Sequence, residues 1–293
     1  MLAVRVHDRH GDYIIDRLRE MRPDIYVSKD KLPVGDRPKA LICFRPPTDE
    51  PLDQYAWIHC TGAGLDHIEA RLSTDAPPPR ITRTLGSMGR QFFEFCLSYL
   101  LADLQRHQAR SVRAKTHLWD PETVAPNFLF DRSVLVVGQG GLGSEISLRM
   151  SALAHQVYSL SRSGRQFSDN VVSVRSVGDI ERPDRIFAVI GVLPNTDATH
   201  NFFDREFFGR LSNCIFINIG RGQTVDDDAL LDALADGTVK RAVLDVFREE
   251  PLPNDHWAWA HPAIDVTPHI SALTRPEDAV DAFVKALSAQ SVT

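Results

Sequence analysis

The sequence predicts an α/β protein of two doubly wound parallel-sheet domains, Rossmann-like or flavodoxin-like, with a cleft between them. Its 293 residues exceed one ordinary domain and suit two. Short apolar runs alternate with polar, helix-compatible segments, which is the spacing of parallel strands joined by crossovers. A glycine-rich turn directly follows one of these runs, as in sheets that bind a ligand at the carboxyl ends of their strands.

In the first unit we expect strands at residues 3–6, 40–44, 57–60 and 80–84. The prolines at 77–79 precede the last of these strands, and the unit ends near residue 85. Residues 89–107 form a helical pattern that is apolar nearly all round. Such a helix is predicted to be buried on every side, between the two domains.

In the second unit we expect strands at residues 133–137, 157–160, 185–193, 214–219, 241–247 and 264–266. Asp226 is positioned to cap a helix that stops at Gly237. A last helix, 277–289, follows Pro276 and is expected to return to the first unit. The predicted domains are therefore residues 1–88 with 276–293, and residues 89–275.

The composition indicates a soluble globular protein, with 43% apolar and 25% charged residues. The net charge of −6 and the absence of a Lys/Arg-rich block argue against a nucleic-acid partner. Residues 92–104 are interrupted by Glu94 and Asp103, and the N-terminal apolar run ends after four residues, so neither a membrane span nor a signal peptide is expected. The four cysteines are far apart and indicate buried thiols rather than metal ligands, which favours the cytoplasm and no metal site.

The glycine-rich turn has the G-x-G-x-x-G pattern, directly after a strand and before a helix. The first glycine allows a tight turn, the second allows a pyrophosphate to approach the backbone, and the third allows helix and strand to pack closely. Ile146, Met150 and Leu153 are expected on one face of the helix. The turn predicts a dinucleotide site at Gly138, Gln139, Gly140, Gly141, Leu142 and Gly143.

The end of the next strand indicates which dinucleotide is bound. Sites that prefer NAD(H) place an acid there, about 20 residues after the glycines. Here the strand is followed by Ser161, Arg162, Ser163 and Arg165, and the first acid is Asp169. Hydroxyl and guanidinium groups suit a 2′-phosphate, so NADP(H) is preferred and NAD(H) remains possible. The alternative is an ordinary solvated turn beside an NAD(H) site.

Polar residues also follow the later strands of the second unit. Arg221 comes after the run at 214–219, Asp245 and Glu250 lie in and after the run at 241–247, and His269 follows the run at 264–266. Because the carboxyl ends of parallel strands meet at one edge, these groups are expected in one site. Taken singly, Arg221 and Glu250 also suit a surface ion pair, and His269 a capping or core histidine.

Together these motifs resemble the D-isomer-specific 2-hydroxyacid dehydrogenases, and among them the glyoxylate/hydroxypyruvate reductases of the A type. The resemblance covers nearly the whole chain. Besides the glycine turn and Ser161-Arg162-Ser163, it rests on Thr61-Gly62-Ala63-Gly64-Leu65-Asp66, Met88-Gly89-Arg90-Gln91-Phe92-Phe93-Glu94, Leu193-Pro194-Asn195-Thr196, Arg221-Gly222, Leu244-Asp245-Val246-Phe247, Glu250-Pro251 and Thr267-Pro268-His269.

The resemblance implies NADPH-dependent reduction of a small 2-oxo acid, glyoxylate or hydroxypyruvate, to the D-2-hydroxy acid. His269 is then the general acid, Glu250 pairs with it and favours imidazolium, and Arg221 holds the substrate carboxylate and polarises its carbonyl, roles that also suit these side chains chemically. The resemblance further implies a carboxylate grip at Gly62, Ala63 and Gly64, a nicotinamide carboxamide contact at Asp245, and a homodimer through the cofactor domain. It places Leu193, Pro194, Ile219, Gly220, Arg221 and His269 beside the cofactor.

Several alternatives stay open. Arg45 either favours a hydroxylated or second-acid substrate or faces solvent, and Trp257 and Trp259 lie either at the pocket rim or in subunit packing. The same scaffold also serves dinucleotide-sensing corepressors and dehydrogenases of bulkier 2-oxo acids such as phenylpyruvate. Glu250 argues against the formate dehydrogenase branch, which has an amide there. Because the sequence ends at Thr293, soon after the last predicted helix, we expect no appended regulatory domain.

Overall fold

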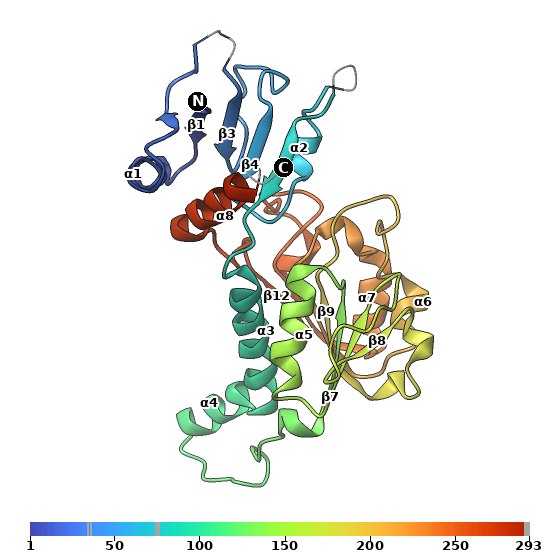
Figure 1. Cartoon of the computed structure of the whole chain (residues 1–293). Coiled ribbons are helices and arrows are strands. Elements are labelled where there is room, and N and C mark those ends of the chain that lie inside the picture. Colours follow the sequence, from blue (N-terminus) through green and yellow to red (C-terminus); the bar gives the residue numbers. More distant parts are fainter. Residues whose placement is uncertain (34, 36, 74–76, 290–293) are drawn as a thin grey trace. The chain divides into compact units, whose positions relative to one another are not determined.

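The computed structural model describes residues 1–33, 35, 37–73 and 77–289 of the chain. It divides into one compact unit of Met1–Met88 with Leu273–Thr293 and another of Gly89–Ala272. The first division falls where we expected it, and the second falls three residues before the expected start at 276. Figure 1 follows the chain through both units.

The first unit contains a five-stranded parallel sheet with the order β2-β1-β3-β4-β5. Doubly wound sheets of the flavodoxin-like type have this order. The sequence analysis anticipated four of these strands, but a strand as short as β2 has no alternating pattern to detect. The strands are β1 (Ala3–His7), β2 (Tyr26–Ser28), β3 (Lys39–Cys43), β4 (Trp57–Cys60) and β5 (Arg80–Arg83).

Helices cover both faces of this sheet. On one face α1 (Gly11–Met21) and α8 (Pro276–Ser288) pack together over a core that includes Val4 and Ile42. Phe283 of α8 stacks on Trp57 of β4, with ring centroids 4.4 Å apart. The last helix therefore returns to the first unit, as predicted. The other face packs against α2 (Asp66–Glu69) and the loop that follows β3.

The second unit contains a seven-stranded parallel sheet with the order β12-β11-β10-β9-β6-β7-β8. The strand order reverses between β6 and β9, which is where such sheets bind ligands. All six predicted strands are present, and the short β8 is additional. The strands are β6 (Ser133–Val137), β7 (Gln156–Leu160), β8 (Val172–Val174), β9 (Ile186–Gly191), β10 (Cys214–Asn218), β11 (Val239–Leu244) and β12 (Ile264–Val266).

The helices of this unit correct two expectations. In α3 (Met88–Leu104) Cys96 and Leu100 are fully buried, whereas Glu94 and Leu101 are exposed, so the prediction of burial on every side is wrong. In α5 (Gly141–Ser151) Ile146 and Met150 are buried, but Leu153 lies beyond the helix end and is 44% exposed. The remaining helices are α4 (His107–Lys115), α6 (Arg205–Phe208) and α7 (Asp227–Ala235), with short 3₁₀ turns at Leu129–Asp131, Val177–Asp179, Pro183–Arg185, Gly222–Thr224 and Trp257–Trp259.

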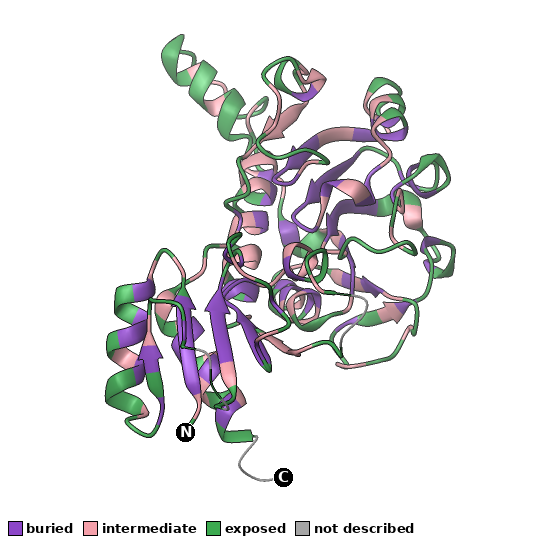
Figure 2. Cartoon of the chain, turned by 90° about the horizontal axis from the view of Figure 1, so that it is seen from above, coloured by how far each residue is buried: buried purple, intermediate pink, exposed green. Residues whose placement is uncertain are grey.

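Burial concentrates in the sheets, as Figure 2 shows. Residues 186–191 of β9 and 214–218 of β10 are buried throughout, as expected for central parallel strands covered on both faces. Asp226 caps α7 as predicted, its carboxylate accepting the N–H of Ala229 at 3.0 Å. All four cysteines lie in the described part of the chain, where they are buried and form no disulfide bond. Among the described residues no helix combines the length and the apolarity needed to span a membrane.

Candidate active site

The glycine turn between β6 and α5 has a different steric reason for each of its three glycines. Gly138 adopts a φ of 116°, a conformation that side chains disfavour. A Cβ added to Gly143 would lie 1.7 Å from the carbonyl oxygen of Gly138, so helix and strand can pack this closely only with glycine. A Cβ on Gly140 would meet no atom within 4 Å. The space beside Gly140 and the start of α5 fits the pyrophosphate of a dinucleotide.

The turn after β7 is fastened to the glycine turn by the side chain of Gln139. Its amide oxygen accepts the hydroxyl of Ser161 at 2.8 Å, and its amide nitrogen donates to the carbonyl of Arg165 at 2.7 Å and to the hydroxyl of Ser173 at 2.9 Å. Gln139 is thus a structural link, a role that its place between two glycines did not suggest. The adenosine end of a dinucleotide lies at this strand end in doubly wound sheets.

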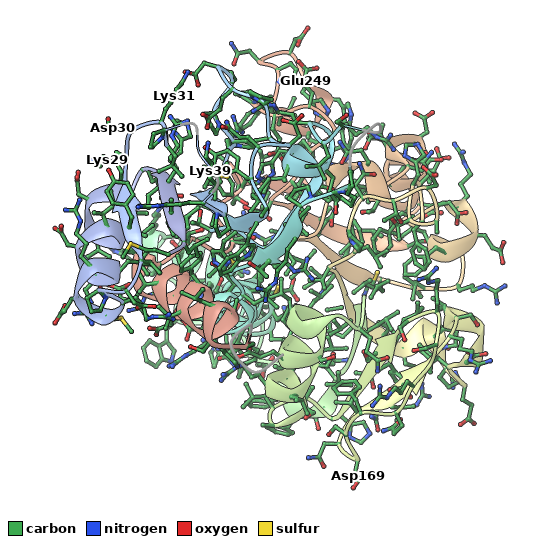
Figure 3. The ribbon with its side chains drawn as sticks, turned by 45° about the horizontal axis from the view of Figure 1, so that its top comes forward. Lys29, Asp30, Lys31, Lys39, Asp169 and Glu249 are labelled. Atoms are coloured by element: carbon green, nitrogen blue, oxygen red, sulfur yellow. The ribbon has the colours of Figure 1, made fainter. Side chains whose placement is uncertain are left out.

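The polar groups of this turn favour an anion. Arg162 and Arg165 are exposed, and neither side chain has a hydrogen bond or ion pair within residues 77–289. The hydroxyls of Ser161 and Ser163 lie 3.4 Å apart. Asp169, the first acid after β7, points away from the body of the unit into solvent (Figure 3).

Arg221 follows β10 on a loop that buried polar groups hold in place. The Asn218 side chain donates to the carbonyl of Arg221 at 3.0 Å and accepts the N–H of Gly220 at 3.1 Å. Thr224 donates its hydroxyl to the same carbonyl at 2.6 Å. Asn218 is fully buried and was not among the residues expected in the site, although an amide directly after an apolar strand is a usable sequence signal.

The loops after β9, β10 and β11 pack tightly against one another. A Cβ on Gly220 would lie 2.5 Å from the carbonyl oxygen of Leu193, and one on Gly222 would lie 2.0 Å from the carbonyl carbon of Phe247. In these loops Ile219 is 3% exposed, whereas Pro194 is exposed. Glycine at these two positions therefore lets the loop of Arg221 approach the loop that holds Glu250.

Glu250 and His269 form a direct pair, with 2.8 Å between the glutamate Oε2 and the histidine Nδ1. The other carboxylate oxygen of Glu250 accepts the N–H of Phe247 at 3.0 Å. Burial alone would raise the pKa of Glu250. The hydrogen bonds from His269 and Phe247, with the nearby charges of His269 and Arg221, outweigh burial and hold that pKa below its ordinary value. Glu250 is therefore a carboxylate at neutral pH, and it fixes the direction of the imidazole.

Asp245 organises the loop that presents His269. Its carboxylate is fully buried and accepts the hydroxyl of Thr267 at 2.6 Å, the N–H of Ile270 at 2.9 Å, the N–H of Ser271 at 3.0 Å and the Ser271 hydroxyl. Its backbone carbonyl accepts the N–H of His269 at 2.9 Å. His269 itself has a φ of 54°, so these bonds hold a residue in a conformation that non-glycine residues rarely adopt. The expected contact with a nicotinamide carboxamide stays a prediction.

In the first unit, the turn at Gly62, Ala63 and Gly64 follows β4. Gly62 packs against the ring of Phe44, where a Cβ would lie 2.6 Å from the ring. Arg83, which the sequence analysis missed, donates to the carbonyl of Ala63 at 2.9 Å. The N–H groups of Ala63 and Gly64 have no acceptor among the described residues. Such free backbone N–H groups suit a carboxylate.

Arg45 is exposed and makes no hydrogen bond or ion pair in the part of the chain that the structure describes. Its side chain therefore faces solvent in this structure, which leaves its role toward a substrate a prediction.

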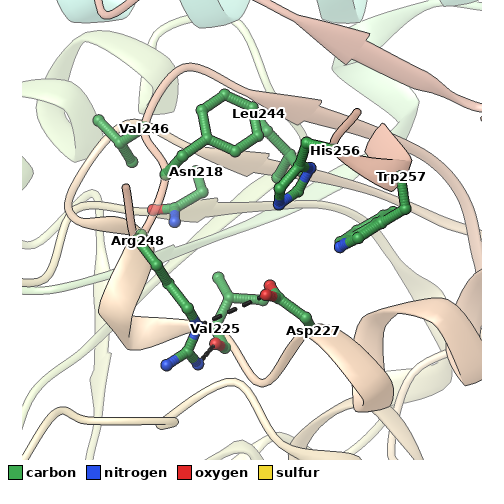
Figure 4. A pocket seen from close by; sticks show the side chains of 10 residues that line it. Asn218, Val225, Asp227, Leu244, Val246, Arg248, His256 and Trp257 are labelled. Atoms are coloured by element: carbon green, nitrogen blue, oxygen red, sulfur yellow. Dashed lines mark hydrogen bonds and ion pairs between the residues drawn. The ribbon is translucent and has the colours of Figure 1, made fainter. Parts of the chain in front are cut away.

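A small pocket is lined by residues that include Asn218, Gly222 and Val225, and Figure 4 shows its lining. Arg248 reaches across it to Asp227, with Nε and Oδ2 3.5 Å apart, and also donates to the carbonyl of Val225. Burial raises the pKa of Asp227 despite the neighbouring Arg248. Trp257 lines this pocket and packs on the core of the unit, whereas Trp259 is 52% exposed. Arg221, Glu250 and His269 are not part of this lining.

The second unit has a glycine turn at the switch point of its parallel sheet. It also has a carboxylate–imidazole pair at the carboxyl edge of that sheet. This combination defines a nicotinamide-dependent dehydrogenase. The family model described as "D-isomer specific 2-hydroxyacid dehydrogenase, NAD binding domain" matches residues 97–271, more than half of the chain. The protein belongs to the D-isomer-specific 2-hydroxyacid dehydrogenases and is an oxidoreductase.

Individual relatives agree with this assignment. A glyoxylate/hydroxypyruvate reductase A of Serratia proteamaculans is 31% identical over 265 residues, which are 85% of this chain and 82% of the relative. A D-isomer-specific 2-hydroxyacid dehydrogenase family protein of Aeromonas salmonicida has a similar structure, with a TM-score of 0.81, 26% identity, and 97% and 93% of the two chains covered. A D-isomer-specific 2-hydroxyacid dehydrogenase of Xanthobacter autotrophicus, solved with NADPH and MES, has a TM-score of 0.81, 25% identity, and coverage of 97% and 92%.

Proposed function

We propose that the protein reduces glyoxylate or hydroxypyruvate to the D-2-hydroxy acid with NADPH. The observation that carries the proposal is the 2.8 Å pair of Glu250 and His269, at the strand ends where Arg221 also lies. NADPH, when bound, supplies the hydride that reduces the carbonyl carbon. The substrate class follows from the relatives named glyoxylate/hydroxypyruvate reductase A.

His269 is the proton donor in this proposal. Reduction of a carbonyl builds negative charge on its oxygen, which needs a proton from a nearby acid. Because Glu250 takes the Nδ1 side of the imidazole, Nε2 is left to face the substrate. An imidazole can both donate and accept a proton, which suits this role, and the ionised Glu250 holds the ring in place.

Arg221 binds the substrate carboxylate in this proposal, and the turn at Gly62, Ala63 and Gly64 offers anion donors within the first unit. A guanidinium offers a planar fork of donors, which suits a carboxylate and the carbonyl beside it. The free N–H groups of Ala63 and Gly64 provide further donors. Each of these donor sets suits a 2-oxo acid better than a neutral ketone.

The preference for NADPH rests on the turn after β7. Arg162 and Arg165 with the hydroxyls of Ser161 and Ser163 suit a 2′-phosphate, and the one acid nearby in sequence, Asp169, points outward. The similar Xanthobacter autotrophicus structure contains NADPH. NADH remains usable at lower affinity.

The test is the rate of NADPH and NADH oxidation with glyoxylate, hydroxypyruvate and phenylpyruvate. We expect the highest kcat/KM with NADPH and one of the two small acids. His269→Gln should lower kcat by at least 100-fold at unchanged NADPH affinity. His155→Gln, which changes an exposed histidine of the same unit, is the matched control and should have wild-type rates. Near-normal turnover in His269→Gln would exclude His269 as the acid.

Two other outcomes decide between the remaining functions. Preference for phenylpyruvate would indicate a dehydrogenase of bulkier 2-oxo acids. Tight NADPH binding without turnover of any 2-oxo acid would indicate a dinucleotide-sensing protein on the same scaffold.

We also propose a homodimer formed through the cofactor unit. Residues 101–130 expose large apolar side chains, namely Leu101, Val112, Leu118, Trp119, Phe128 and Phe130, with Trp119 95% exposed. The helix α4 within this segment buries none of its residues. Several exposed large apolar side chains within one segment are typical of an interface between subunits. Sedimentation velocity should give the dimer mass, and Trp119→Glu should shift it toward the monomer.

The proposed compartment is the cytoplasm. The four buried cysteines form no disulfide bond among the described residues, which suits a reducing environment, and burial raises the pKa of Cys214 to about 12. Fractionation of cells that express the full-length protein tests this assignment.

A further inference from the structure

The turn after β7 is a compact, preformed structure. The N–H of Gly164 donates to the carbonyl of Ser161 at 3.1 Å and to its hydroxyl at 3.2 Å, and the N–H of Arg165 donates to the hydroxyl of Ser163 at 3.2 Å. Gly164 has a φ of 57°, which closes the turn. Since Gln139 also fastens this turn to the glycine turn, its polar groups are in place before any ligand binds.

Arg175 lies directly against this turn from the neighbouring strand. β7 and β8 pair with Leu160 opposite Val174, so Ser161 and Arg175 leave the sheet side by side. The stem of Arg175 covers Gly164, where a Cβ would lie 2.6 Å from the arginine Cγ. Its Nε donates to the carbonyl of Ser163 at 3.2 Å. The position of Arg175 is therefore set by the turn itself.

A second contact fixes the backbone of Arg175. The carboxylate of Asp179 accepts the N–H groups of Arg175 and Ser176, each at 2.9 Å. These bonds hold the pKa of Asp179 below its ordinary value, so the carboxylate stays ionised and the contact persists at neutral pH. The backbone and the aliphatic part of the Arg175 side chain are thus held in place, and its two Nη groups extend beyond these contacts.

The arginines of this turn form no ion pair in the described part of the unit, and the nearby carboxylate of Asp179 binds the backbone of Arg175 rather than a guanidinium group. Within residues 77–289, the guanidinium groups of Arg162 and Arg165 have no acceptor, and that of Arg175 uses only Nε, leaving both Nη groups without an acceptor. Like charges in proximity repel one another, so an anion bound among them would relieve that repulsion. A phosphate monoester, with nearly two negative charges and three acceptor oxygens, suits three guanidinium groups and the serine hydroxyls, with Ser161 redirecting its hydrogen from Gln139 to a phosphate oxygen.

We infer that Arg175 is a specificity-determining residue that binds the 2′-phosphate of NADP(H) from the β8 side of the turn, together with Arg162, Arg165 and the Ser161 and Ser163 hydroxyls. The inference rests on the proposed NADPH preference, which the Ser161-Arg162-Ser163 motif indicated. It adds to that motif Arg175, which lies 14 positions after Ser161. The sequence motif after β7 does not identify Arg175, because Arg175 reaches this turn only through the pairing of β8 with β7.

The test measures binding by calorimetry on the full chain, with 2′,5′-ADP and 5′-AMP as probes that differ only in the 2′-phosphate. Wild type should bind 2′,5′-ADP at least tenfold more tightly. Arg175→Met keeps the stem over Gly164 and removes the charge; it should lose at least tenfold in affinity for 2′,5′-ADP and less than twofold for 5′-AMP. Arg175→Lys should recover part of the loss. Arg185→Ala is the charge-matched control, since Arg185 precedes β9 at the opposite end of the strands.

Each contrary result has a separate meaning. Unchanged 2′,5′-ADP affinity in Arg175→Met, or an equal loss for both nucleotides, would overturn the role of Arg175 and leave the NADPH preference standing. Equal affinity of wild type for the two nucleotides would overturn the 2′-phosphate site as a whole, and with it the NADPH preference.

Discussion

Asp245→Asn is expected to destabilise the second unit, because Asp245 accepts four hydrogen bonds through a fully buried carboxylate. The Thr267 and Ser271 hydroxyls can rotate to accept from an amide, but the backbone N–H groups of Ile270 and Ser271 cannot. An amide oxygen can satisfy one of these N–H groups, and the other is left facing an NH₂ group. An unsatisfied buried donor costs about 1–3 kcal/mol, and loss of the charge adds to this, so we expect about 2–4 kcal/mol.

The assay is equilibrium urea unfolding, with the transition of the second unit fitted separately. Asp265→Asn is the control, since the Asp265 carboxylate is 34% exposed and pairs with Arg241; we expect a loss below about 1 kcal/mol there. A loss below about 1 kcal/mol in Asp245→Asn as well would refute the reasoning.

A companion variant, Ser271→Ala, separates two roles of Asp245. It removes one bond to the His269 loop and keeps the carboxylate. We expect a lower kcat at unchanged NADPH affinity if Asp245 acts by holding the loop. Unchanged kcat in Ser271→Ala, together with weaker NADPH binding in Asp245→Asn, would instead favour the nicotinamide contact that the family resemblance implies.

Gly140→Ala should fold normally but bind NADPH more weakly, because its Cβ would occupy the open space that we assign to the pyrophosphate. Gly143→Ala should instead lower the free energy of unfolding, because its Cβ would lie 1.7 Å from the Gly138 oxygen. Thermal unfolding and NADPH titration distinguish the two effects. The lowered pKa of Glu250 means that its stabilising contacts are full above its unfolded-state pKa and are lost as the pH falls through the folded-state value. The stability difference between wild type and Glu250→Gln should therefore be constant from about pH 6 to 8 and shrink below about pH 4; a difference that grows on acidification would contradict this. Arg83→Ala should raise the KM for glyoxylate several-fold at unchanged NADPH affinity, since Arg83 holds the Ala63 carbonyl; steady-state kinetics with an unchanged KM would remove Arg83 from the site.

Local patterns predicted much of the fold. The predicted fold class is confirmed. It could be predicted because buried parallel strands give short apolar runs and the glycine turn has a stringent pattern. The three-residue strands β2 and β8 escaped detection because they have no period to measure. The exposure of Leu101 was misjudged because the composition of α3 shows how apolar it is and does not show what covers it.

In the candidate site, the sequence identified residues that directly follow strands. It did not identify residues that contact these loops from other parts of the fold. Arg221, Glu250 and His269 follow strands in order, and sheet topology brings their loops to one edge. Arg83 ends β5 and Arg175 follows β8, so strand pairing rather than local sequence brings each of them beside its turn. The loop-holding bonds of Asp245 depend on the backbone path of residues 267–271, which no local sequence pattern encodes.

The most direct test of the central claim is a crystal structure of the protein with NADP⁺ and oxalate, a mimic of a 2-oxo acid. We predict the Nε2 of His269 and the guanidinium of Arg221 within about 3.2 Å of oxalate oxygens, with Nδ1 of His269 still paired to Glu250. An imidazole turned away from both the oxalate and the nicotinamide ring, with Arg221 bound elsewhere, would contradict the account.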